Sequence, residues 1–166
     1  MNTQTEIFDL AQSLGHALEV KQWLLVTAES CTGGGIAQAV TAVAGSSQWF
    51  DRGFVTYTNQ SKREMLGVSG PTLESYGAVS EPVVKEMTEG ALKFSHAQVA
   101  ISVSGIAGPS GGTVQKPVGT VCFGWGVKGQ ALHTQTLCFD GDRESVRSQA
   151  IIFALQQLLT LVQPKL

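Results

Sequence analysis

Two short apolar segments of this chain each end abruptly in a glycine-rich stretch. Residues 23–27 break into Glu29-Ser30-Cys31-Thr32-Gly33-Gly34-Gly35, and residues 98–103 run into residues 104–112, which hold four glycines. Apolar runs of this length, bounded by turn residues, are typical of buried strands. Glycine lets the backbone turn sharply and approach a ligand closely. Because ligands bind beyond the carboxyl ends of strands in α/β sheets, we expect the two stretches to line one pocket.

The rest of the sequence alternates helical and strand-like patterns. Apolar residues at helical spacing predict helices over residues 4–20, 36–43, 62–66, 81–94 and 143–162, the third of them capped by Asn59. Strand-like segments are residues 53–58 and an expected hairpin formed by residues 118–127 and 131–139. This order predicts a single domain over residues 1–166, a three-layer α/β/α sandwich with a mixed, mostly parallel sheet of about five to six strands.

The charge and hydropathy of the chain exclude several classes of partner. Only 14% of the residues are charged, the net charge is −2, and no basic patch marks a nucleic-acid surface. An anionic substrate would therefore need a local positive pocket. The N-terminus lacks the basic start and continuous apolar run of a signal peptide, and no apolar stretch reaches the roughly 18–20 residues of a membrane span. We therefore expect a cytoplasmic protein without membrane contact.

Cysteine and histidine side chains are few and scattered. They are Cys31, Cys122, Cys138, His16, His96 and His133. An odd number of cysteines without a CxxC pair argues against disulfides and against a zinc site. We expect no metal and no cofactor, with Cys122 and Cys138 serving as core residues.

Ser30 is the first candidate for chemistry. A hydroxyl at a strand-to-helix turn has three interpretations: a helix cap, part of an anion site, or a nucleophile. As a nucleophile it would face backbone N–H groups of Thr32, Gly33 and Gly34, which could hold an oxyanion. The neighbouring Cys31 is a rival nucleophile because a helix N-terminus can acidify a thiol, but no histidine lies near it.

A serine nucleophile needs a base, and the sequence offers Lys62. Lysine can act as a base when burial lowers its pKa, and Lys62 follows a predicted strand on the same side of the sheet as Ser30. Taken alone, a lysine on a short helix is usually a solvated surface charge. Ser104, at the entrance of the second glycine-rich stretch, could relay a proton between the two or could simply stabilise a turn.

Substrate contacts are suggested by two arginines and a tyrosine. Arg143 and Arg147 lie four residues apart on one face of the last predicted helix, where they could grip a phosphate or pair with Asp142 or Glu144. Residues 108–112 are an alternative phosphate site. Tyr57 could stack on a cationic ring or could be a buried strand aromatic.

Taken together, the segments resemble the CinA C-terminal domain family in order and spacing. The matching stretches are Thr27-Ala28-Glu29-Ser30-Cys31-Thr32-Gly33-Gly34, Gly53-Phe54-Val55-Thr56-Tyr57 with Lys62, Gly77-Ala78-Val79-Ser80, Ser104-Gly105-Ile106-Ala107-Gly108-Pro109 and Lys116-Pro117-Val118-Gly119-Thr120.

The resemblance implies a three-layer fold and deamidation of nicotinamide mononucleotide to nicotinate mononucleotide and ammonia, which recycles a by-product of NAD consumption. It also implies a Ser30 nucleophile, a Lys62 base, a second hydroxyl at Ser104 and a homodimer. The chain looks like the stand-alone form of the domain, without the extra N-terminal domain of larger relatives.

Three other functions stay open at this point. A silent domain that binds nucleotides would share the glycine-rich turns without turnover. A regulatory domain would bind a partner protein whether or not Ser30 is present. An amidase for another small amide would use the same Ser–Lys pair on a different substrate.

Overall fold

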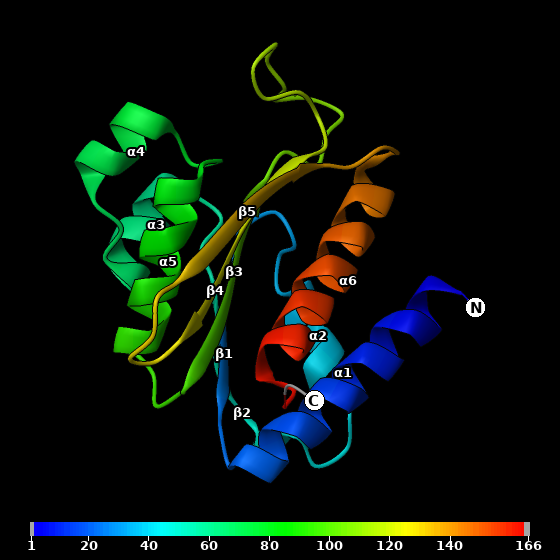
Figure 1. Cartoon of the computed structure of the whole chain (residues 1–166). Helices are drawn as coiled ribbons and strands as arrows, with labels where there is room; N and C mark the ends of the chain where they lie inside the picture. The colour runs from blue at the N-terminus through cyan, green and yellow to red at the C-terminus, as the bar shows by residue number, and fades with distance from the viewer. Residues whose placement is uncertain (1, 165–166) are drawn as a thin grey trace.

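The structure is a computed structural model that describes residues 2–164, and it has a five-stranded mixed sheet at its centre (Figure 1). The strand order is β2-β1-β3-β4-β5. The strands are β1 (Leu25–Glu29), β2 (Phe50–Val55), β3 (Val99–Gly105), β4 (Thr120–Val127) and β5 (His133–Cys138). Strands β2, β1 and β3 are parallel neighbours, and β4 is antiparallel to both β3 and β5. The predicted mixed sheet is confirmed, with five strands.

Helices cover both faces of the sheet (Figure 1). One face carries α1 (Thr3–Lys21), α2 (Gly35–Thr41) and α6 (Arg143–Val162), and the other carries α3 (Asn59–Leu66), α4 (Gly70–Tyr76) and α5 (Glu81–Lys93). Successive strand residues point to opposite faces. Accordingly, Leu25 packs in the core beneath α1 and α6, whereas Val26 packs in the core beneath α3 and α5. The three-layer α/β/α architecture is therefore confirmed.

Several elements differ in detail from the sequence-based expectation. Strand β2 begins at Phe50 and ends at Val55, three residues earlier than predicted, because the chain leaves the sheet before Thr56 to enter α3. The cap of α3 is Thr58 and not Asn59, since the Thr58 hydroxyl accepts the Ser61 N–H in a capping box. The short α4, which starts at a Ser69 cap, was not predicted.

The two β-strand cysteines have different environments. Cys122 is buried on β4, as expected, and its Sγ lies 3.3 Å from the Thr136 hydroxyl. The expectation that Cys138 is a core residue is wrong, because β5 is an edge strand and leaves this side chain exposed.

Helix α6 is long and apolar enough, by length and composition, to cross a membrane, which the sequence-based expectation of no such segment missed. Its apolar residues have partners in the fold. Val146, Ala150, Leu155 and Leu158 are fully buried in the core that α6 shares with α1 and the sheet. The composition of α6 is thus that of a core helix packed on a sheet.

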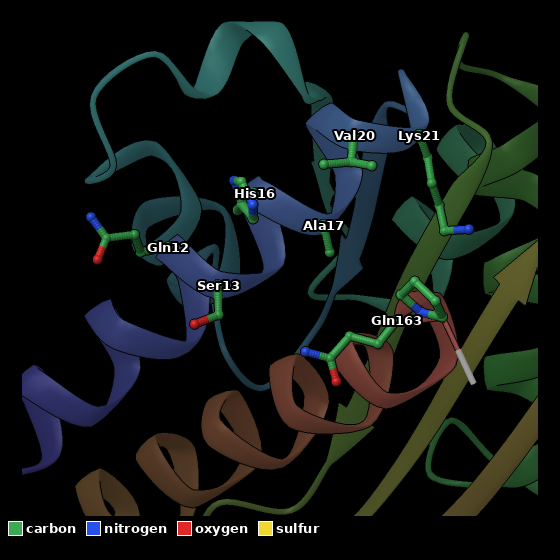
Figure 2. Close-up of a pocket in the computed structure, with 8 residues that line it drawn as sticks. Gln12, Ser13, His16, Ala17, Val20, Lys21 and Gln163 are labelled. Atoms are coloured by element: carbon green, nitrogen blue, oxygen red, sulfur yellow. The ribbon is translucent and has the colours of Figure 1, made fainter. Parts of the chain in front are cut away.

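A hollow of about 660 Å³ lies between the second half of α1 and the end of α6 (Figure 2). It is lined by Gln12, Ser13, His16, Ala17, Val20, Lys21, Gln163 and Pro164. None of the residues singled out for chemistry lies there. The functional site therefore has to be sought at the carboxyl ends of the strands.

Candidate active site

The two glycine-rich stretches meet at the carboxyl ends of β1 and β3, as the sequence predicted. Glu29 pairs with Val103 in register, and the Ser30 N–H donates to the Val103 carbonyl over 3.0 Å. A pocket of about 250 Å³ opens there, below the roughly 300–1,000 Å³ typical of drug-sized sites. Its lining includes Ser30, Cys31, Tyr57, Asn59, Lys62, Ala78, Val79, Ser104, residues 105–108, Ser110, Gly111 and Arg143.

Lys62 is buried and points at Ser30. Its Nζ lies 3.0 Å from the Ser30 Oγ and donates to the Thr56 carbonyl over 2.8 Å. The side chain is only 1% exposed, and within residues 2–164 it has no carboxylate partner, since the one salt bridge there joins Arg52 to Asp51. Burial lowers the pKa of Lys62 from 10.5 to about 8, because the charged form loses its hydration. Lys62 is therefore not the solvated surface charge that a short helix usually carries.

The local sequence explains how Lys62 reaches this position. The capping box formed by Thr58 and Ser61 starts α3 directly after β2, so Lys62 falls in the first turn of the helix. The Thr56 N–H donates to the Glu29 carbonyl over 2.8 Å, which fixes the segment between β2 and α3 against the end of β1. Lys62 and Ser30 thus lie on segments that follow two adjacent strands, β2 and β1.

Cys31 is poorly suited to compete with Ser30. Burial raises the pKa of the Cys31 thiol to about 12, and the nearby Glu29 carboxylate opposes ionisation as well. The thiol therefore stays protonated at neutral pH, whereas thiolate is the reactive form. Ser30 has the Lys62 amine within hydrogen-bond distance, so the geometry favours Ser30 over Cys31 as the candidate nucleophile.

Ser104 lies near the end of β3 and lines the same pocket, with 1% of its surface exposed. Among the described residues, its hydroxyl makes no hydrogen bond to Ser30 or Lys62. The structure thus brings Ser104 into the site without a preformed relay.

The turn after Ser30 is organised around a carboxylate that the sequence did not single out. Glu29 is buried, and it accepts hydrogen bonds from the Thr32 hydroxyl at 2.6 Å and from the N–H groups of Ile36 and Ala37 at 2.8 and 3.0 Å. These N–H groups belong to the first turn of α2, where donors lack partners within the helix. The only sequence signal was an acidic residue ending an otherwise apolar strand.

Removal of the Glu29 carboxylate is expected to destabilise the fold. Replacing Glu29 with alanine leaves two buried donors and one partly buried donor without an acceptor, which should lower the free energy of unfolding by about 2–4 kcal/mol. Glu29→Gln keeps one acceptor oxygen, so its free energy of unfolding should fall by less than that of Glu29→Ala. Urea unfolding of both variants measures the difference, and an unchanged midpoint for Glu29→Ala would contradict this role.

The predicted substrate contacts are not among the residues that line the pocket; they are Thr32, Gly33 and Gly34. The Thr32 hydroxyl is committed to Glu29, and the Gly33 N–H donates to the Ser30 carbonyl over 2.9 Å. Gly33 and Gly34 have φ values of 59° and 95°, a conformation that favours glycine. Their glycine character is therefore explained by the turn.

The two arginines of α6 have different surroundings. Arg143 lines the pocket and donates to the Tyr57 hydroxyl and to the Gly108 carbonyl, at 2.8 and 2.9 Å. Arg147 lies outside the pocket lining and donates to backbone carbonyls of the turn after Ser30. The alternative in which they pair with Asp142 or Glu144 is not observed between the described residues.

The pocket has an exposed tyrosine and a positive charge, and the charge favours an anionic ligand. Tyr57 is 56% exposed, so the alternative of a buried strand aromatic is wrong, because β2 ends before this residue. The charged residues in the described lining are Lys62 and Arg143, and no acidic residue is among them. The pocket is thus locally positive in a chain of net charge −2.

No histidine lines this pocket in the part of the chain that the structure describes. His16 lies on α1, and His133 lies on the edge strand β5. Residues 2–164 also contain no group of three His, Cys, Asp or Glu side chains arranged to hold a metal ion. The groups available for proton transfer are therefore the lysine and the hydroxyls.

Comparison with known proteins identifies the family of this chain. The family model described as the CinA C-terminal domain matches residues 7–162. The chain belongs to this family. It is 56% identical over 157 residues to the nicotinamide-nucleotide amidohydrolase PncC of Enterobacter agglomerans, covering 95% of this chain and 96% of that protein. It is 52% identical to the protein of the same name from Escherichia coli K12, covering 94% of each.

Solved structures of the family have the same fold. The crystal structure of the competence/damage inducible protein CihA from Agrobacterium tumefaciens superposes with a TM-score of 0.93 at 43% identity, covering 95% of this chain and 96% of that one. An Escherichia coli CinA superfamily protein gives a TM-score of 0.91 at 45% identity, covering 97% and 92%.

Proposed function

We propose that this chain hydrolyses the carboxamide of nicotinamide mononucleotide, giving nicotinate mononucleotide and ammonia. The observation that carries the proposal is the buried Lys62 Nζ, 3.0 Å from the Ser30 Oγ in a positively charged pocket. The names of the close relatives support the same reaction and the same substrate class.

The first half of the reaction forms an acyl-enzyme. Neutral Lys62 accepts the Ser30 proton, and the Ser30 Oγ attacks the carboxamide carbon. The Thr56 carbonyl accepts one Nζ–H and so leaves the lone pair of the amine free to face Ser30. The negative charge that develops on the amide oxygen is stabilised by backbone N–H groups of the turn after Ser30.

The second half releases ammonia and regenerates the enzyme. The protonated Lys62 transfers its proton to the departing nitrogen, and the C–N bond breaks as ammonia leaves. Water then attacks the ester with Lys62 as base, releasing nicotinate mononucleotide and Ser30. Ser104, in the same pocket, relays protons between the water, Ser30 and Lys62 once the substrate is bound.

Arg143 is the proposed phosphate ligand. It is the arginine that lines the pocket, its planar guanidinium suits a phosphate, and its present partners are a neutral hydroxyl and a carbonyl that an anion can replace. Tyr57 is held beside it and presents an exposed ring on which the pyridinium can stack.

Loss of Arg143 should therefore weaken binding of the phosphorylated substrate. Arg143→Ala is expected to raise KM for nicotinamide mononucleotide by about 10–100-fold, the effect of losing a charge-assisted contact. KM for nicotinamide riboside, which lacks the phosphate, should not change. Equal effects on both substrates in steady-state kinetics would refute the assignment.

The proposed function is tested by measuring ammonia release from purified protein supplied with nicotinamide mononucleotide, nicotinamide riboside or nicotinamide. Release from the nucleotide at the highest kcat/KM supports the proposal. Tight binding without release would indicate a silent nucleotide-binding domain. Preference for an unphosphorylated amide would indicate another amidase, and a partner protein captured without turnover would indicate a regulatory domain.

The proposed reaction belongs to a cytoplasmic cycle that returns the amide by-product of NAD consumption to NAD synthesis. The homodimer that the family resemblance implies stays a prediction. Light scattering of the purified chain measures its mass directly.

A further inference from the structure

Arg147 holds the backbone of the turn that follows Ser30. Its Nε donates to the Cys31 carbonyl over 3.1 Å, and one terminal nitrogen donates to the Thr32 carbonyl over 3.2 Å. The side chain is half-buried and, within residues 2–164, has no carboxylate partner. Its guanidinium is therefore devoted to two successive peptide groups of this turn.

These contacts, together with the Gly35 N–H that donates to the Thr32 carbonyl over 2.8 Å, set the direction of the peptide N–H groups. The peptide bonds of the turn are trans, so each N–H points opposite to the carbonyl of its own peptide. With the Cys31 carbonyl turned to Arg147, the N–H of Thr32 points away from it. With the Thr32 carbonyl also turned to Arg147, the Gly33 N–H donates to the Ser30 carbonyl over 2.9 Å.

The last of these bonds orients the peptide that joins Ser30 to Cys31. The Ser30 carbonyl of this peptide accepts the Gly33 N–H, so the Cys31 N–H of the same peptide points in the opposite direction. Cys31 itself lines the pocket. No backbone carbonyl among the described residues accepts the N–H of Cys31 or of Thr32. Within residues 2–164, these two N–H donors beside Ser30 thus have no backbone acceptor.

Resting on the proposed function, we propose that Arg147 is a positioning residue, which holds the turn so that the N–H groups of Cys31 and Thr32 form the oxyanion hole. It acts through the backbone and does not touch the substrate. A preorganised donor of this kind is effective because it needs no reorientation when the oxyanion forms.

Gly33 provides the space that this arrangement needs. A Cβ at Gly33 would lie 3.2 Å from the Arg147 guanidinium, closer than ordinary contact, at a φ of +59° that side chains rarely adopt. The glycine-rich character of the turn is therefore linked to an arginine more than a hundred positions later in the chain.

Arg143 and Arg147 form a matched pair for the experiment, since both lie on α6 one turn apart and only Arg143 lines the pocket. Arg147→Ala is expected to lower kcat for nicotinamide mononucleotide by about 100-fold, as for loss of an oxyanion donor, with KM unchanged. Arg143→Ala should raise KM.

Millimolar guanidinium should partly restore kcat to Arg147→Ala, because the free ion can bind the same carbonyls. Arg147→Lys keeps the charge without the planar fork and should remain below wild type.

A second readout needs no nucleotide. A fluorophosphonate probe reacts with the Ser30 Oγ: the O–P bond forms, fluoride leaves, Lys62 takes the serine proton, and the phosphoryl oxygen gains negative charge. Arg147→Ala should slow this labelling, and Lys128→Ala, a change in the exposed turn between β4 and β5, should not. Both variants are compared at equal folded fraction, checked by circular dichroism.

The outcomes separate the two proposals. A wild type that releases no ammonia but labels at Ser30 would overturn the proposed substrate only. A raised KM with normal kcat in Arg147→Ala, or normal kcat and normal labelling, would overturn the role of Arg147. A loss of kcat explained fully by unfolded protein and unaffected by guanidinium would also overturn it.

Discussion

Replacing Ser30 with alanine is expected to lower ammonia release from nicotinamide mononucleotide by on the order of 10⁴–10⁶-fold, the range seen when a serine nucleophile is removed. Alanine cannot form the acyl-enzyme, and Lys62 then has no hydroxyl to deprotonate at 3.0 Å. The fold should be unaffected, because the Ser30 backbone N–H still donates to Val103. Ammonia release with purified protein and circular dichroism measure the two effects.

Cys31→Ala is the matched control, since it changes the neighbouring side chain by a similar volume. The Cys31 thiol has its pKa raised to about 12 by burial and carries no nucleophilic role in the proposed mechanism. Activity should therefore stay close to that of the wild type. If Cys31→Ala were inactive while Ser30→Ala turned over normally, the nucleophile would be the thiol.

The second large effect is expected for Lys62→Met, which should lower kcat/KM by on the order of 10³–10⁴-fold, as for loss of a general base. Methionine retains an unbranched side chain of similar length in this buried position, so packing is largely kept. Lys62→Arg is a further variant, because arginine keeps the positive charge but stays protonated in proteins and so cannot act as a base. Near-normal activity in either variant would exclude Lys62 as base.

The pH dependence of the wild type should identify the same group. Lys62 must be neutral to accept the serine proton, and its pKa is lowered to about 8. kcat/KM should therefore rise about tenfold per pH unit below pH 8 and level off above it. A profile that is flat from pH 6 to 9 would contradict this assignment.

Stability should respond to pH through the same residue. The pKa of Lys62 is 10.5 in an unfolded chain and about 8 in the fold, so the unfolded state binds more protons between these values. The cost of burying the ammonium is absent above pH 10.5 and fully present below pH 8, where it reaches about 3 kcal/mol. Lys62→Met lacks this cost and should unfold at a higher urea concentration than the wild type at pH 7. The difference in unfolding midpoint between Lys62→Met and the wild type should narrow as the pH rises towards 10. A difference that stays constant with pH would refute the explanation.

Much of the fold could be predicted because its signals are local. Short apolar runs, helical spacing and capping residues such as Ser80 and Asp142 lie within a few positions of the elements that they specify. The misplaced elements have weak local patterns. Strand β2 is an edge strand whose residues are only partly buried, and the short α4 buries only Leu73. Such segments depend on packing that neighbouring residues do not reveal.

The sequence by itself determined the chemistry that is available: a hydroxyl at Ser30, an amine at Lys62, a hydroxyl at Ser104 and two arginines on one helix face. Only the tertiary structure decided which of these groups meet and in what state. It places Lys62 beside Ser30, where burial lowers the pKa of the lysine, and it separates Arg143, which lines the pocket, from Arg147, which bonds to the backbone of the turn. The physical reason is that burial, and the direction of a hydrogen bond between segments far apart in the chain, arise only when the sheet brings those segments together.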